Sequence, residues 1–353
     1  MLRTILSGDL PRSRALAAVL IVILVGLALA PLVFPGTRSL NVAAKVSVFV
    51  LLVASYDLLL GYTGVVSFAH TMFFGIGGYG VGIAMAKLGS TWGSLALGAL
   101  AALVLSALLA LAIGLLSLRV KAIFFAMITL AVASFFQILA SQLSWLTGGE
   151  DGLTFRLPEL LQPGTKLFEI PLLGVDASGK HLSYYIVFFG ALALFLLLLR
   201  VVNSPFGRVL LSIRENEFRS EALGYRTVTY RTVANCIGAL LATAAGILYA
   251  LWLRYTGPDT TLSFNIMIDI LLMVVIGGMG TLYGSVLGAT IFVVAQNYLQ
   301  DLMKLASGAT QGLPLVPNLL HPDRWLLWLG ILFIVCVYYF PSGIVGRLRA
   351  RRA

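Results

Sequence analysis

Charged residues are scarce in this sequence. Only 11% of its 353 residues are Asp, Glu, Lys or Arg, while 59% are hydrophobic. A soluble domain has about one-quarter charged residues, so a soluble fold is excluded. A helix needs about 20 apolar residues to cross roughly 30 Å of hydrocarbon, and apolar runs of that length recur between residues 15 and 340. The sequence therefore predicts an all-α integral membrane protein, with residues 1–353 forming one membrane domain.

Cysteine and histidine are also rare. The two cysteines, Cys236 and Cys336, both lie inside apolar runs, so neither a disulfide framework nor a thiolate metal site is expected. The three histidines, His70, His181 and His321, do not have the spacing of metal ligands. Without clustered His or Cys or paired carboxylates, nothing supports a membrane enzyme.

Two nucleotide-binding patterns occur, and neither has the right context. Residues 75–80 match G-x-G-x-x-G but lie inside an apolar run with no preceding strand. Residues 174–180 nearly match a P-loop, but His181 replaces the Ser or Thr that would bind magnesium. We therefore expect no cofactor bound by this chain, and any ATP-driven motor, with its ATP and Mg, must be another subunit.

Apolar runs predict about ten transmembrane helices, within a range of about eight to eleven. The expected spans are residues 15–34, 41–60, 64–86, 93–117, 122–144, 183–202, 232–254, 265–282, 285–303 and 325–342.

The net charge is +10. In a soluble protein this would suggest nucleic acid binding, but here 15 of the 24 basic residues lie near the two termini, at Arg119 and Lys121, and from Arg200 to Arg231. The positive-inside rule explains that distribution. We therefore expect a multi-pass protein with both termini in the cytoplasm, a cytoplasmic loop at 201–231, an external loop at 145–182 and no nucleic acid partner.

The expected external loop, residues 145–182, is too long to be a simple connector. It contains five acidic residues and turn-forming Gly-Gly and Pro-Gly pairs. These features predict an ordered external cap, with a flexible linker as the alternative.

The cytoplasmic loop at 201–231 has the signals of an amphipathic helix. Ser204 followed by proline is typical of a helix start, and Gly224 of a stop. Glu215 and Arg219 would form an i,i+4 pair. One side of this single helix would present Leu211, Phe218 and Ala222. Such a helix could dock in a groove of a soluble motor subunit, or lie at the lipid headgroups.

Glycines recur at helical spacing and interrupt two apolar runs, one in each half of the chain. Residues 61–64 and 277–280 are the interrupted segments. Such a pair predicts an internal repeat with discontinuous helices near a substrate path, and tight helix packing without a path is the alternative. The glycines expected at helix contacts are Gly61, Gly64, Gly75, Gly77, Gly78, Gly82, Gly277, Gly278, Gly280, Gly284 and Gly288.

Two acidic residues fall inside expected spans, Asp57 and Asp269. Charges within a bilayer are costly and mark functional sites by default, so both are candidates for the substrate path, with His70 a weaker one. Asp57 could instead be hydrated near the cytoplasmic interface. A self-sufficient transporter or channel with Asp57 and Asp269 as a proton relay is an alternative of a different class.

A family resemblance rests on motifs spread in order along most of the chain. They are Gly61–Gly64, Ser67–His70, Phe73–Gly77, Phe125–Met127 with Thr129 and Leu130, Thr147–Gly149 with Asp151 and Gly152, Ser204–Arg208, Arg214–Glu217, Glu221–Ala222 with Gly224, and Leu272–Gly278. In these residues the chain resembles the LivM-type permeases, of the LivH/LivM family, from branched-chain amino acid ABC importers.

The resemblance implies a bacterial inner-membrane complex with a second, LivH-type permease, two cytoplasmic ABC ATPases and a periplasmic binding protein. It also implies an ATPase-coupling role for Arg208, Leu211, Arg214, Glu215, Glu217, Phe218, Glu221, Ala222 and Gly224. Gly224 follows Glu221 more closely than in the EAA pattern of other importers. Asp57 stands where the family more usually has an amide-like residue, which leaves the cargo open. Permeases for urea and short amides look similar and are the nearest alternative.

Overall fold

The computed structural model describes residues 13–33, 36–117, 122–170, 175–309, 321–339 and 343–350. Within these ranges, nine segments are helical, long and apolar enough to cross a membrane. They are α2 (Arg14–Val33), α3 (Thr37–Asp57) with η1 (Leu58–Thr63), α4 (His70–Leu88), α5 (Trp92–Ser117), α6 (Ala122–Gln142), α8 (Gly179–Val202), α11 (Thr227–Leu253), α12 (Pro258–Thr261) with α13 (Phe264–Gly277), and α14 (Leu282–Ala309). The predicted all-α membrane fold is confirmed.

The last expected span is shorter than a full crossing in the described residues. Helix α16 (Trp325–Tyr339) has 15 residues, which is roughly 22 Å of helix. Residues 340–342 of the expected span lie outside the described ranges, and α17 (Gly343–Ala350) follows.

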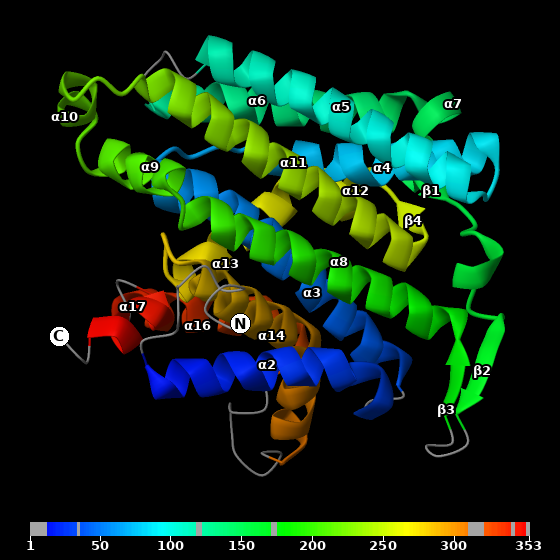
Figure 1. Cartoon of the computed structure of the whole chain (residues 1–353). Coiled ribbons are helices and arrows are strands. Elements are labelled where there is room, and N and C mark those ends of the chain that lie inside the picture. Colours follow the sequence, from blue (N-terminus) through cyan, green and yellow to red (C-terminus); the bar gives the residue numbers. More distant parts are fainter. Residues whose placement is uncertain are drawn as a thin grey trace.

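Helix α3 is the centre of the bundle. It contacts α8, α11, α13 and α14. In the most apolar stretch of its span 89% of the residues are buried inside the protein, against 17% for α2 and 22% for α6. Figure 1 shows α4, α5, α6 and α11 on one side of α3 and α2, α14 and α16 on the other. The exposed residues of the outer helices are apolar, for example Val22, Leu108 and Ile123, which is the surface that lipid requires. Buried α3 therefore positions the polar groups of the interior.

The helix that contains α3 is interrupted at its glycines. Its last turns widen into the π-helix η1, and Gly64 ends it with φ +72°. Helix α4 starts only at His70, whose Nε2 lies 2.9 Å from Oγ of Ser55 in α3. The chain has therefore turned back beside α3 before α4 begins, so the expected span at 64–86 starts six residues late.

The second interruption lies between α13 and α14. Helix α13 ends at Gly277, and Gly278 and Gly280 follow with φ +114° and +77°. Positive φ is accessible to glycine without the clash that a Cβ would cause. The expected span at 265–282 is therefore a shorter helix and a non-helical segment.

The elements gather at two ends of the bundle (Figure 1). Helices α9 (Pro205–Glu215), α10 (Glu217–Ala222) and α17 lie at one end, together with the start of α2, where Leu16 packs with Leu287 and Val345. The hairpin of β2 (Lys166–Ile170) and β3 (Val175–Ser178) lies at the opposite end. The sequence-predicted arrangement of the 201–231 and 145–182 segments at opposite ends agrees with this placement, while their assignment to the two membrane sides stays a prediction.

Residues between α6 and α8 fold on the end of the bundle. They comprise α7 (Ser144–Thr147), η2 (Gly149–Asp151), β1 (Leu153–Thr154), η3 (Glu159–Leu161), β2 and β3. Strand β1 pairs antiparallel with β4 (Tyr255–Thr256), which anchors this segment to the end of α11. Phe155, Leu157 and Leu161 are buried beneath it. Of the near P-loop, Gly174 lies outside the described residues, and the remainder forms β3 and the start of α8.

Glycines bring helix backbones together at several contacts. A Cβ on Gly77 of α4 would collide with the Thr243 carbonyl of α11, and a Cβ on Gly246 of α11 with the Phe74 carbonyl of α4. Gly277, Gly284 and Gly288 do the same between α13 and α14, whereas Gly75, Gly78 and Gly82 face side chains. Since Gly75–Gly80 lies inside helix α4, the rejection of a dinucleotide-binding turn is confirmed.

Candidate functional site

The two glycine-interrupted segments, one from each half of the chain, meet in space. A Cβ on Gly61 would collide with the backbone of Gly280 and with the Asp57 carboxylate. The Gly280 N–H donates to Asp57 Oδ1 at 2.8 Å, the backbone of Thr281 follows directly, and Asp57 Oδ2 is buried without a hydrogen-bond partner. We call these residues, Asp57, Gly61, Gly280 and Thr281, the glycine junction. It joins the end of α3 to the start of α14.

Asp57 is fully buried in the glycine junction, with 0% of its surface exposed. The alternative that Asp57 is a hydrated residue at the interface is therefore wrong. Its Oδ1 accepts from the Gly280 N–H just before α14, where the helix macrodipole favours negative charge. Its clearest chemical role is to cap α14 from a different helix.

Arg214 of α9 reaches the glycine junction from residues 204–224, which we call the coupling segment. Its guanidinium donates a hydrogen bond to the Gly61 carbonyl. Gly64, at φ +72°, lies directly under the side chain, since a Cβ there would be 3.3 Å from Arg214 Cγ. Arg214 also interacts electrostatically with the Asp57 carboxylate. A residue expected to face the ATPase thus ties α9 to the membrane helices.

His70 belongs to a different contact, between α3, α4 and α11. Its ring is fully buried and packs edge-on against Tyr56, with 5.2 Å between ring centroids. A Cβ on Gly238 of α11 would lie 3.5 Å from its Cε1. Its Nε2 lies 2.9 Å from Ser55 Oγ. His70 is therefore held among packed helices.

Asp269 belongs to a second polar group, formed by α3, α13 and α14. Gln296 Nε2 donates to Asp269 Oδ2 at 3.3 Å, and Lys45 Nζ donates to Gln296 Oε1 at 2.9 Å. We call Lys45, Asp269 and Gln296 the amide-bridged group. All three side chains are half-buried. Lys45 precedes Asp57 by twelve residues in α3, which is roughly 18 Å of helix, so the two acids belong to separate networks rather than to one relay.

Sequence reasoning missed Lys45 and Gln296. Lys45 lies inside the expected span at 41–60, so the argument that selected Asp57 would have selected it as well. Gln296 has no charge and gave no signal, since only the fold places its amide between a cation and a carboxylate. Arg38 and Asp301 form a further ion pair between α3 and α14, at 2.5 Å, on exposed surface.

The coupling segment is two helices rather than one. Helix α9 ends at Glu215, Asn216 is extended with φ −156° and ψ 100°, and the Asn216 side chain then caps α10 by accepting from the Arg219 N–H at 2.9 Å. The prediction of a single helix was wrong because this cap restarts the chain in a new direction. The expected Glu215–Arg219 i,i+4 pair is lost with it.

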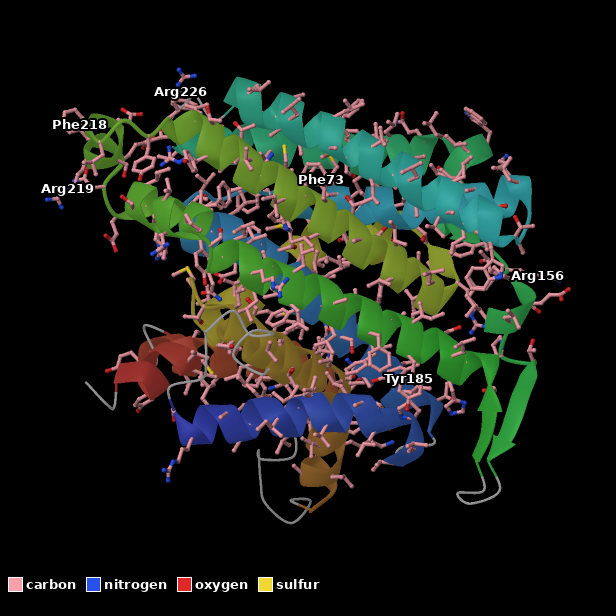
Figure 2. The ribbon with its side chains drawn as sticks, viewed as in Figure 1. Phe73, Arg156, Tyr185, Phe218, Arg219 and Arg226 are labelled. Carbon is pink, nitrogen blue, oxygen red and sulfur yellow. The ribbon has the colours of Figure 1, made fainter. Side chains whose placement is uncertain are left out.

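The break also separates the three apolar residues expected on one helix side. Leu211 is half-buried and packs against the core, whereas Phe218 is 82% exposed and Ala222 is exposed. Figure 2 shows Phe218 and Arg219 projecting from the tip of α10, away from the long helices. Leu223, at 69%, adds to this exposed apolar surface.

The remaining residues of the expected coupling set divide between internal contacts and open surface. Glu217 pairs with Arg231, and Glu221 Oε1 accepts from the Thr227 hydroxyl at 2.7 Å, so both hold α10 to the start of α11. Gly224 ends the segment at φ +92° in open space. Arg208 and Glu215 are exposed on α9.

Comparisons with known proteins agree on one family. Residues 38–337 match the model of the branched-chain amino acid transport system / permease component family. The high-affinity branched-chain amino acid transport permease LivM of Salmonella typhimurium is 25% identical over 88% of this chain and 71% of its own length. BraD of Pseudomonas aeruginosa, another high-affinity branched-chain amino acid permease, is 27% identical over 85% of this chain and 92% of its own.

A third relative matches a shorter stretch at higher identity. It is a Methanocaldococcus jannaschii protein described as a LivM branched-chain amino acid permease, 31% identical over 173 residues, so that the match spans 48% of each chain. No solved structure matches this chain. Because the family model covers most of the sequence, the chain belongs to the permease components of branched-chain amino acid transport systems.

Proposed function

We propose that this chain is the permease subunit of an ATP-driven importer and forms part of the translocation path for branched-chain or related amino acids. It would work in the bacterial inner membrane, termini in the cytoplasm, with a second LivH-type permease, two ABC ATPases and a periplasmic binding protein. The family match supports the transport class and the aliphatic cargo. The chain has a transport role and no catalytic one in this proposal.

One observation carries the ATP-driven part of the proposal. Phe218 of α10 and Leu223, which directly follows this helix, are exposed at the end of the bundle that also bears α9 and α17. Exposed apolar patches of this kind commonly mark protein interaction sites. An aromatic anchor on a short helix is suited to a groove of a soluble partner, and the ion pair and hydrogen bond of Glu217 and Glu221 fix its orientation.

Uptake by the reconstituted complex tests this function. Vesicles containing the chain and its co-purified subunits should accumulate leucine, isoleucine or valine only when ATP is inside with the ATPases and loaded binding protein is outside. ATP-dependent accumulation of urea or short amides instead would replace the cargo. Accumulation driven by a proton gradient without ATP would show instead that the chain is a self-sufficient transporter.

A further inference from the structure

We propose that Lys45, Asp269 and Gln296 form a binding site for the charged backbone of an aliphatic α-amino acid within the membrane. This inference rests on the proposed function and names how this chain would recognise its cargo. Lys45 lies eight residues after the first residue of a 27-residue span, and Asp269 lies inside the 20-residue span Pro258–Gly277. Ionisable groups in such positions are retained at a cost and mark substrate routes by default.

The arrangement of the charges matches a zwitterion. Among the described residues, Lys45 and Asp269 form no direct ion pair, although direct contact would give the greatest Coulomb attraction in a medium of low dielectric constant. The Gln296 amide stands between them instead, with its oxygen toward the ammonium and its N–H toward the carboxylate, at 2.9 and 3.3 Å. A free amino acid presents the same polarity with full charges. Its carboxylate would replace the amide oxygen at Lys45, and its ammonium would replace the amide N–H at Asp269.

The surroundings favour an aliphatic cargo over a polar one. Ile266 and Leu272 lie three residues before and after Asp269 on the same helix face and are half-buried. The Lys45 ammonium also lies 5.5 Å from the centre of the Phe49 ring, so aromatic and aliphatic surface borders the charges. Because the three polar side chains are half-buried rather than enclosed, the group is open to a surface of this chain.

The competing explanation is that Lys45, Asp269 and Gln296 only hold the helices together. Another ion pair in the same chain shows what a purely structural contact looks like. Arg38 and Asp301 join the same two helices, α3 and α14, by a direct ion pair, and Arg38 also donates to the Asn297 carbonyl. That pair fastens α3 to α14 without an interposed amide. Arg38→Met is therefore a matched control for Lys45→Met in the same helix α3, and Asp301→Asn, in the neighbouring helix α14, is the control for removing the negative charge of Asp269.

Equilibrium binding to the purified membrane complex, with neither ATP nor the periplasmic binding protein present, tests the site separately from transport. Leucine should raise the thermal midpoint of the complex in a concentration-dependent way. 4-Methylpentanoate, which lacks the ammonium, and 3-methylbutylamine, which lacks the carboxylate, should not. Lys45→Met and Asp269→Asn should each weaken leucine binding by roughly tenfold to a hundredfold, the loss of one charge-assisted contact, while Arg38→Met and Asp301→Asn keep it.

The double variant Lys45→Met with Asp269→Asn separates the two explanations. A structural network would regain stability when both charges are removed together, and leucine would still bind. The proposed site loses leucine binding in the double variant whatever its stability. Leucine binding that persists in the single or double variants, or that the two single-charge analogues reproduce, would overturn the proposal. ATP-driven uptake is measured independently, so a failed importer and a failed binding site give different results.

Discussion

The substitution Gly61→Ala adds one methyl group where the two halves of the chain touch. The new Cβ would overlap the Gly280 backbone and the Asp57 carboxylate, neither of which is the free end of a flexible side chain. Gly280 is fixed at φ +77° and Asp57 is fully buried, so α3 must move away from the start of α14.

The size of the effect follows from two contributions. Overpacking by a methylene-sized group in a rigid contact costs about 1 to 3 kcal/mol. Movement of α3 also weakens the 2.8 Å hydrogen bond from Gly280 to Asp57, and hydrogen bonds to charged groups contribute about 1.5 to 3 kcal/mol. Because the two contributions overlap in part, we expect a destabilisation of roughly 2 to 5 kcal/mol, less than their sum.

Thermal unfolding of the detergent-solubilised chain, followed by the loss of the monodisperse peak on size exclusion, measures this effect. Gly26→Ala is the matched control, because Gly26 lies in a span helix, is exposed, and has nothing within 4 Å of an added Cβ. It should leave the midpoint unchanged or raise it slightly, since alanine favours a helix by about 1 kcal/mol. Equal midpoints for the Gly61 and Gly26 variants would refute the close contact at the glycine junction.

Three further results are expected. Phe218→Ala should reduce the affinity for the ATPases by roughly thirtyfold, the loss of about 2 kcal/mol typical of an aromatic anchor. Phe135→Ala is the control, because it removes a 58% exposed ring from α6 and should leave the subunit stoichiometry unchanged. Equal effects of the two variants would mean that α10 lies at the lipid headgroups instead. Arg214→Ala should keep the ATPases bound but lower uptake per ATP hydrolysed several-fold, because the hydrogen bond from α9 to Gly61, of about 1.5 to 3 kcal/mol, is lost; an unchanged ratio would contradict that link. Single cysteines at positions 226 and 176 should react with an impermeant reagent from the inside and the outside, respectively, and inside labelling at position 176 would invert the topology.

The membrane helices could be predicted because their cause is local. Hydrocarbon requires a continuous apolar run whatever the neighbours are, so the positions of α5, α6 and α8 follow from the sequence alone. The interrupted helices show the limit. Glycines marked both interruptions, but α4 begins at His70, six residues later than expected, and the contact of His70 with Ser55 is tertiary and carries no sequence signal.

In the coupling segment the sequence contained two conflicting signals, an apolar periodicity that favoured one helix and a helix cap at Asn216 that favoured two. Spacings of seven and four between Leu211, Phe218 and Ala222 indicated one continuous helix. Asn216, followed by Glu217 in what becomes the first turn, is the pattern of a new helix start, since Asn side chains compete for backbone N–H groups. Periodicity over a short stretch is weaker than a cap of this kind. The contact of Arg214 with the membrane helices could not be predicted either, because its hydrogen-bond acceptor, the Gly61 carbonyl, carries no sequence signal.

Asp57 and Asp269 satisfy the same sequence rule, yet the structure gives them opposite surroundings. Asp57 is fully buried, its Oδ1 accepts from the Gly280 N–H, and its Oδ2 is buried without a hydrogen-bond partner, so the carboxylate is not open to a surface of the chain. Asp269 is half-buried and bonded to a side-chain amide, which can rotate away at the cost of a 3.3 Å hydrogen bond. We infer that neutralising Asp57 acts on the connection between the halves and, through Arg214, on coupling, whereas neutralising Asp269 acts on cargo. Asp57→Asn should therefore change the number of ATP molecules hydrolysed per leucine taken up and leave leucine binding intact. Asp269→Asn should weaken leucine binding and leave that number unchanged.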